Sequence, residues 1–416
     1  MSSRRIKIIS TCDNIILFSL YAIAFFLPIS KAIIEGASSV AIICYLVKKL
    51  VQWEDILQTH LNIPIFSYFI ICIFSIFISS NLGTSARTFF FKTLQHIAFF
   101  FVVVGTLNNR QRLRNILFIL LISSALLGTD GIFQYFTHKD FFRHRPYRVT
   151  GRISASLVTP NDFGCYLVSV LPFAIVFAFG KLRKITWRIL SGILSLFLFI
   201  CLSLTLSKGA WYGFLASVIF ISMWTPFLLF FSLAAALFIV MTKQYYTLAI
   251  RDRLDQLFVL DPSTIGDSGS IERKMILPIA WRIFVSKPWL GIGLGTFMFN
   301  FSKFIQDNYP YGVAYAHNCY LQIAAEIGII GLLSFLSILI LFFYQGIRIL
   351  NTKQKTFFWH VLLGSLGAIV GYGVHMSVDT VFYSVDLGMM FWLILGFGTA
   401  ALKNLELEEN KITATP

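Results

Sequence analysis

A histidine and an asparagine stand immediately before a long apolar run in the stretch AHNCYLQIAAEIGIIGLL, residues 316–333. Histidine titrates near neutrality, so it can remove a proton from a hydroxyl group. If the run is a helix, Ala324, Gly328 and Gly331 share nearly the same face as His317, and small residues favour close helix packing. The pattern predicts a histidine at the top of a buried face that points toward the interior of the bundle. A histidine that only anchors the helix at a membrane interface is the alternative.

Other polar side chains stand at the ends of apolar runs. His375 and Asp379 are spaced i and i+4 and share a face if their run is helical, while Lys208 lies in a short hairpin between two runs. A local helix pair and a lysine extended toward lipid headgroups are the structural alternatives. Glu326 lies within an apolar run, where a carboxylate is costly. For Glu326 we expect a structural hydrogen bond to a neighbouring helix.

Basic side chains gather in two stretches that could bind an anion. One holds Lys139, Arg143, Arg145, Arg148 and Arg152, and the other, from Lys243 to Lys303, holds eight more, including Arg273 and Arg282. Contact with lipid headgroups is the alternative. The chain has no DxD motif and no CxxC pair among its six cysteines. We therefore predict no metal, no cofactor and no disulfide framework.

The composition identifies the solvent in which these residues must be positioned. Of 416 residues, 57% are hydrophobic and 13% are charged, whereas soluble domains carry about 25% charged residues. So much apolar surface requires a lipid bilayer. The net charge of +15 suggests anionic membrane lipids or a phosphorylated substrate as partners. Because the basic residues lie in loops between apolar runs, we discount nucleic acid.

Apolar runs of spanning length predict an all-α polytopic membrane protein with about 12 transmembrane helices. The runs are 14–34, 36–51, 63–80, 89–106, 113–136, 157–180, 187–206, 209–223, 226–242, 319–345, 357–378 and 387–402. The distribution of lysine and arginine in the short connections places both termini inside.

Residues 1–416 are predicted to form a single membrane domain, with one sizeable outer loop at 243–318 between the ninth and tenth helices. Within this loop, a helix capped by Ser270 and bent near Pro278 is expected. The GIGLG motif at 291–295 follows no strand, so it is not a dinucleotide-binding fingerprint.

The order of several motifs resembles a known family. TLSKGAW is followed by SGSIERK and PWLGIGLGTF, then by AHNCYLQIAAEIGIIGLL, and GRISASLVTPNDFGCYL precedes them all. This order resembles the O-antigen ligase/O-antigen polymerase superfamily of bacterial membrane glycosyltransferases. The resemblance covers roughly residues 145–400, and its most specific part is the HNxxLQxxxExGxxG block that begins at His317.

The resemblance implies transfer of a glycan from an undecaprenyl-pyrophosphate carrier at the periplasmic face of the bacterial inner membrane. It implies that His317 is the catalytic base and that Arg148 and Arg273 bind the pyrophosphate. The family usually has arginine where this chain has Lys208. Lysine keeps the charge but loses the bidentate geometry of arginine.

The residue types agree with this chemistry, because an acceptor hydroxyl must be deprotonated and a charged leaving group must be stabilised. The further candidates for binding the donor are Arg145, Lys208 and Arg282, and His375 and Asp379 complete the substrate-binding residues. Asn318 would fix the tautomer of His317 or hold a sugar hydroxyl.

A ligase that uses lipid A-core oligosaccharide as the acceptor is the first prediction. A polymerase that joins carrier-linked repeat units is the alternative, and a protein O-oligosaccharyltransferase is less favoured because no large soluble appendage is visible. A flippase or other transporter is the rival from another class. Transporters place polar residues near the bilayer midplane, often in repeated halves, and this sequence shows neither feature.

Overall fold

The computed structural model describes residues 3–52, 57–146, 151–180, 184–225, 268–305, 312–352 and 355–413, and within these ranges the chain is helical without β-strands. The helices up to residue 137 are α1 (Ser3–Phe26), α2 (Lys31–Gln52), α3 (Asn62–Phe77), α4 (Leu82–Thr88), the π-helical turn η1 (Phe89–Thr93), α5 (Leu94–Thr106) and α6 (Arg110–Thr137). Those that follow are α7 (Pro160–Phe179), α8 (Ile185–Thr205), α9 (Lys208–Ser222), α12 (Ser268–Ser286), α13 (Phe297–Phe301), α14 (Cys319–Thr352), α15 (Phe357–Met376), the 3₁₀ turn η2 (Val381–Tyr383) and α16 (Val385–Thr413).

The all-α prediction is confirmed, and every predicted run that lies in the described residues coincides with helix. The run 226–242 lies outside them. Among the described residues, eight helices are long and apolar enough to cross a membrane, with α4, η1 and α5 counted as one. One boundary is wrong. The first run was expected to continue to residue 34, but the helix ends at Phe26, just before Pro28, which lacks the backbone N–H that a helix requires.

Helices α7, α15 and α16 form the centre of the bundle. In the most apolar windows of these helices 83%, 78% and 94% of residues are buried, against 33% for α1 and 22% for α8. Helix α15 packs against both α7 and α16. The peripheral helices α1 and α8 therefore bury far fewer of their apolar residues, as expected for helices that face lipid.

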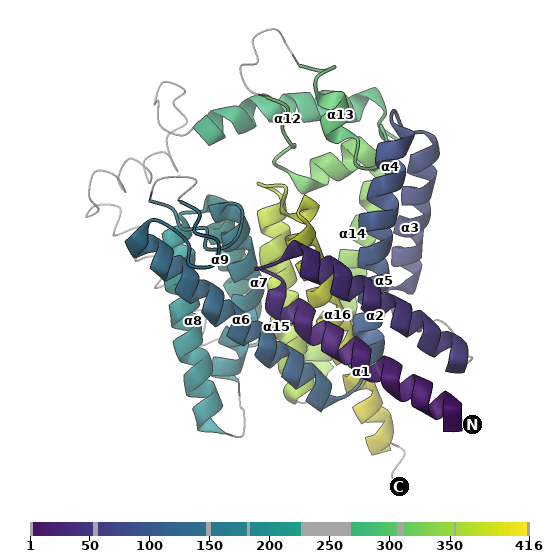
Figure 1. The fold of residues 1–416 in the computed structure, drawn as a ribbon, viewed down its shortest axis with the longest axis vertical. Coiled ribbons are helices and arrows are strands. Elements are labelled where there is room, and N and C mark those ends of the chain that lie inside the picture. Colours follow the sequence, from purple (N-terminus) through teal and green to yellow (C-terminus); the bar gives the residue numbers. More distant parts are fainter. Residues whose placement is uncertain are drawn as a thin grey trace.

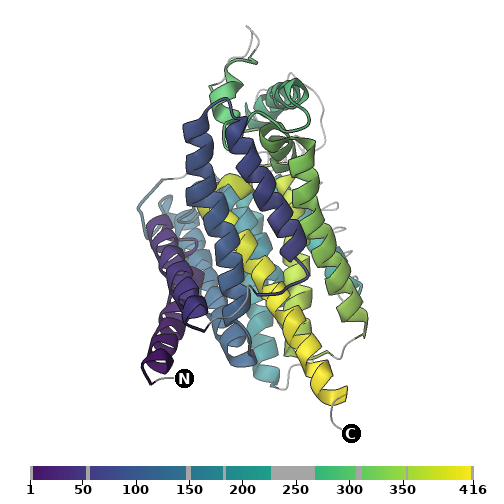
Figure 2. The same cartoon turned by 90° about the vertical axis from the view of Figure 1, so that its right-hand side faces the viewer.

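The two ends of the bundle differ. Helices α12 and α13 lie across one end, and both chain termini lie at the opposite end (Figures 1 and 2). This position of the termini agrees with the predicted twelve spans, since an even number would place both termini on one side of the bilayer. Of the predicted outer loop 243–318, the structure describes 268–305 and 312–318.

The helix that follows His317 is broken. The backbone leaves the helical region at Ile327 (φ −124°, ψ 15°) and Gly328 (φ 72°, ψ −179°), so α14 consists of two helical segments. The expected common face of His317, Ala324, Gly328 and Gly331 is wrong. His317 precedes α14 and has a non-helical backbone, and the helical rotation does not continue through the break to Gly331.

The segment that contains GIGLG fills this break. The Ile292 amide donates to the Ala325 carbonyl (3.0 Å), and the Gly293 amide donates to the Glu326 carbonyl (2.9 Å). A Cβ at Gly328 would overlap the backbone of Trp289. The break therefore requires glycine, both for its positive φ and for the close approach of two backbones. The GIGLG motif therefore has a structural role, because its backbone hydrogen bonds hold residues 291–295 against α14.

Candidate functional site

His317 lies just before the first turn of α14, in the left-handed region with φ 49°. The next residue, Asn318, caps the helix, because its Oδ1 accepts the Leu321 amide (3.0 Å). On the other side, the Ala316 amide donates to the Gln322 side chain (3.2 Å). The backbone is thus held on both sides of His317, while the imidazole remains 26% exposed.

Asp379 meets His317 from the turn beyond α15. His317 Nδ1 lies 3.1 Å from Asp379 Oδ1, although the two residues are 62 positions apart. The same carboxylate oxygen accepts the Thr380 amide (2.8 Å), and the Asp379 carbonyl accepts the Cys319 thiol (3.1 Å). Because a carboxylate only accepts, this hydrogen bond requires a proton on Nδ1, and in the neutral imidazole the lone pair is then on Nε2.

Asn161 and Arg152 extend these contacts. The Asn161 amide nitrogen donates to Asp379 Oδ2 (2.7 Å), and Arg152 Nη2 donates to Asn161 Oδ1 (2.9 Å). Arg152 is itself held by the Thr205 carbonyl at the end of α8, through Nε (2.9 Å). We call Arg152, Asn161, Asp379 and His317 the His317 network. It joins the segment before α7 to α7, α14 and the turn after α15.

The sequence around Pro160 explains how Asn161 is positioned. Thr159 caps α7 by accepting the Asp162 amide at its hydroxyl (3.1 Å), and Asp162 accepts the Thr159 amide in return (3.0 Å). Proline at the first helical position fits because its missing N–H would be unpaired there. This reciprocal capping box fixes the first turn of α7 and therefore the direction of Asn161.

Lys208 and His375 lie beside this network. Lys208 is the first residue of α9, which Ser207 caps. A Cβ at the neighbouring Gly209 would lie 2.6 Å from Val378 and 2.9 Å from His375. The start of α9 therefore packs directly on the end of α15 and the turn that carries Asp379. His375 is 1% exposed, so it is part of the packed bundle.

The predicted arginines have different positions. Arg148 lies outside the described residues, as does the side chain of Arg273 in the first turns of α12. Arg145 is exposed, and its amide donates to Asp140 Oδ2 (2.8 Å). Arg282 is half-buried on α12. Among the described residues, no hydrogen bond joins Arg145 or Arg282 to the His317 network.

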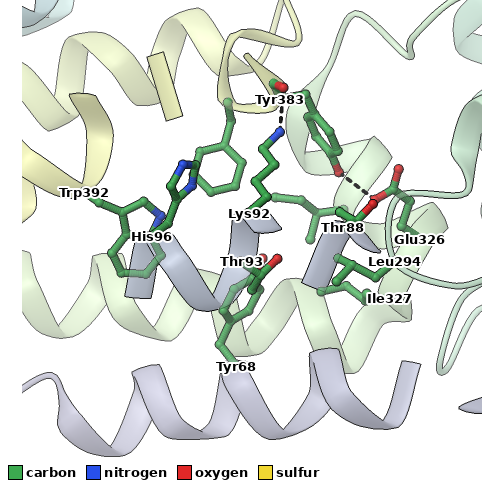
Figure 3. Close-up of a pocket in the computed structure, with 12 residues that line it drawn as sticks. Tyr68, Thr88, Lys92, Thr93, His96, Leu294, Glu326, Ile327, Tyr383 and Trp392 are labelled. Atoms are coloured by element: carbon green, nitrogen blue, oxygen red, sulfur yellow. Dashed lines mark hydrogen bonds between the residues drawn. The ribbon is translucent and has the colours of Figure 1, made fainter. Parts of the chain in front are cut away.

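A second polar network lies deeper along α14, around a pocket (Figure 3). Lys92 Nζ, from η1, donates to the Tyr383 carbonyl (2.5 Å), and the Tyr383 hydroxyl donates to Glu326 Oε2 (3.2 Å). Glu326 also accepts the Gly295 amide (2.8 Å) and the Gln322 side chain (3.2 Å). The expected structural hydrogen bond for Glu326 is present. We call Lys92, Glu326 and Tyr383 the Lys92 network.

The Lys92 network holds the turn that carries Asp379. Tyr383 lies at the end of this turn, with the Lys92 ammonium 5.2 Å from the centre of its ring. Burial raises the pKa of the Tyr383 phenol well above its usual value of about 10. The hydroxyl therefore stays protonated and remains a donor to Glu326. The network thus fixes the far end of the turn without contacting His317.

Sequence reasoning missed Arg152 and Asn161 as members of the site. Arg152 was counted only as one cation of a basic stretch, and Asn161 appeared only within the motif GRISASLVTPNDFGCYL. The TPND sequence was the available signal for Asn161, since threonine followed three residues later by an acid is a capping-box pattern. No local pattern indicates that this turn meets residue 379.

Comparison with known proteins agrees with the motifs. Residues 193–336 match the family model described as O-antigen ligase. The matched part contains Lys208 and His317, whereas Arg152, Asn161 and Asp379 lie outside it. No curated protein matches the chain. The match supports a function of the O-antigen ligase or polymerase type, and it confirms the predicted resemblance of this chain to the O-antigen ligase superfamily.

Proposed function

We propose that the protein is an O-antigen ligase-type glycosyltransferase. It transfers a glycan from an undecaprenyl-pyrophosphate carrier to a hydroxyl group of lipid A-core oligosaccharide, at the periplasmic face of the bacterial inner membrane. One observation carries the proposal: a partly exposed histidine whose Nδ1 is bonded to a carboxylate (3.1 Å), within the stretch that matches the ligase family.

In this proposal His317 is the general base. With the proton on Nδ1 held by Asp379, the lone pair of Nε2 is available to take the proton of the acceptor hydroxyl. The hydroxyl oxygen then bonds to the anomeric carbon of the glycan, and the bond from that carbon to the pyrophosphate oxygen breaks. Asp379 stabilises the imidazolium that forms, as the carboxylate does in serine-protease triads. Asn161 and the Thr380 amide orient Asp379.

The leaving group takes its negative charge with the lipid carrier. Cations can stabilise it without a metal ion. Lys208 begins α9, whose next residue, Gly209, contacts His375 and Val378 beside the turn of Asp379. The family resemblance adds Arg148 and Arg273, so Arg148→Ala and Arg273→Ala should weaken use of the donor.

A polymerase remains the second candidate, because it would use the same donor and the same base. The test is a reconstituted assay with a defined carrier-linked glycan, in which either lipid A-core or a second carrier-linked unit is offered. We expect transfer to lipid A-core, without added divalent metal. Joining of two carrier-linked units, with no product on lipid A-core, would make the enzyme a polymerase.

A further inference from the structure

An exposed aromatic side chain lies just before the candidate base in the chain. Tyr315 is 43% exposed, Ala316 is fully buried, and the His317 side chain is 26% exposed. The segment that leads into α14 thus directs its middle residue into the protein. Tyr315 and His317 therefore lie on the accessible side of this segment, close enough along the chain to contact the same ligand.

The ring of Tyr315 packs on the same turn that holds His317. Its centre lies 6.0 Å from the centre of the Tyr383 ring, with the two planes inclined by 36°. Tyr383 belongs to the Lys92 network, which fixes the far end of the turn. Asp379, earlier in the turn, lies 3.1 Å from His317 Nδ1. One turn therefore positions the imidazole and the aromatic ring together.

Asn318 supplies a hydrogen-bond donor on the other side of His317. Its Oδ1 accepts the Leu321 amide (3.0 Å) as the cap of α14, while Asp379 holds the proton of His317 Nδ1. An asparagine side chain also carries two N–H donors. Because Asn318 is only half-buried, its amide nitrogen can donate to a hydroxyl group of a ligand at His317.

The two ends of the turn separate the two substrates of the proposed reaction. The start of α9, whose first residue is Lys208, packs on Val378 near the start of the turn, whereas Tyr315 packs on Tyr383 at its end. In a single displacement, the attacking oxygen and the leaving oxygen lie on opposite sides of the anomeric carbon. With the pyrophosphate on the side of Lys208, the acceptor approaches from the side of Tyr315.

We propose that Tyr315 and Asn318 form the acceptor subsite, which binds the pyranose ring whose hydroxyl is deprotonated by His317. This inference rests on the proposed function. The C–H groups on one face of the pyranose stack on the Tyr315 ring, and a neighbouring sugar hydroxyl accepts from the Asn318 amide nitrogen. The attacking hydroxyl must lie within about 3 Å of His317 Nε2. A flat aromatic surface suits a sugar ring rather than a phosphate group, which has no apolar face.

Steady-state kinetics of the full-length protein tests this subsite, with the glycan acceptor and the carrier-linked donor varied separately. Tyr315→Leu removes the aromatic face and should raise the KM for the acceptor about three- to tenfold, with kcat and the KM for the donor largely retained. Tyr315→Trp restores a flat ring and should lower the KM for the acceptor again. Tyr135→Leu is the matched control, since Tyr135 on α6 is 42% exposed and packs on the ring of Phe136.

Asn318→Ser tests the second contact separately. Serine keeps the cap of α14 but loses the longer amide donor, so the KM for the acceptor should rise about two- to tenfold. An unchanged KM for the acceptor in both Asn318→Ser and Tyr315→Leu would overturn the subsite.

Three other outcomes would also contradict it. A rise in the KM for the donor instead would assign Tyr315 to the donor, and an equal loss in the Tyr135 control would indicate contact with the membrane. No transfer by the wild type to either lipid A-core or a second carrier-linked unit would overturn the proposed function, and the subsite with it. Transfer by the wild type that Tyr315→Leu matches at every acceptor concentration would overturn the platform role of Tyr315 alone.

Discussion

The His317 network and the Lys92 network both connect α14 to the residues between α15 and α16, but they differ in accessibility. Glu326 is 1% exposed, and its carboxylate accepts hydrogen bonds from a backbone amide, a glutamine and a tyrosine. His317 is 26% exposed, and its described bond is made through Nδ1. A carboxylate with three protein donors stabilises structure, whereas a ring with one nitrogen held and one edge exposed can react with a substrate.

Among substitutions in these two networks, His317→Ala should cause the largest loss of glycan transfer. Removal of a general base typically lowers the rate by about 10²–10⁴-fold. Because the side chain is partly exposed, abundance in the membrane and thermal stability should hardly change. Glycan transfer by the purified variant is the measurement. The matched control is His144→Ala, since His144 is an exposed histidine that also has a positive φ. Near wild-type transfer by the His317 variant would mean that the histidine is structural.

Asp379→Asn should have the next largest effect. Asparagine keeps the size of the side chain but loses the charge that holds the proton on His317 Nδ1 and stabilises the imidazolium. We expect kcat to fall on the order of 10²-fold, with little change in the KM for the donor. Steady-state kinetics separates the two parameters. A rise in KM at constant kcat would show that Asp379 binds substrate rather than orienting the base.

Lys92→Met should lower the stability of the protein more than its activity, which is the opposite of the result expected for His317→Ala. The change leaves the Tyr383 carbonyl without its buried donor, which costs on the order of 1–3 kcal/mol. The melting temperature should therefore fall clearly, while transfer falls less than about tenfold, because the His317 network keeps its own contacts. Lys31→Met is the control: Lys31 is 45% exposed, and its ammonium lies 3.9 Å from Asp386, which is too far for a hydrogen bond. Loss of transfer without loss of stability would place Lys92 at the substrate.

Lys208→Arg should have the smallest effect. Arginine keeps the positive charge, restores the residue that the family usually has, and can bind a phosphate in bidentate geometry. We expect transfer within about twofold of the wild type. A loss greater than tenfold would show that the space between α9 and the Asp379 turn admits lysine only, and Lys208 would then be a packing residue.

The sequence predicted the class of fold, because it depends on local patterns, and the same kind of pattern singled out His317 as a candidate site residue. Apolar runs are long enough to identify spans, and a histidine at the start of one is visible by eye. The pairing of His317 with Asp379 was not predicted. Spacing pointed instead to a helical pair of His375 and Asp379, but α15 ends at Met376. Asp379 therefore lies in the turn beyond the helix, where it contacts a residue 62 positions away.

The break in α14 was missed for a similar reason. Residues 319–345 are apolar enough to predict one continuous helix, and glycines are common in transmembrane helices. What breaks the helix is the segment from Pro288 to Thr296, whose backbone takes over hydrogen bonds of Ala325 and Glu326. A single sequence shows both segments but not their contact.

The left-handed backbone of His317 ties reactivity to conformational strain. The backbone of His317 has φ 49°, a conformation that costs a residue with a Cβ about 1–2 kcal/mol. Glycine at this position would relieve the strain. The free energy of unfolding of His317→Gly should therefore exceed that of His317→Ala by roughly 0.5–1 kcal/mol, after the greater chain entropy of glycine is counted. His317→Gly should accordingly melt at a higher temperature, and both variants should be inactive. In the proposed function, the imidazole therefore occupies a backbone position where glycine would give a more stable protein.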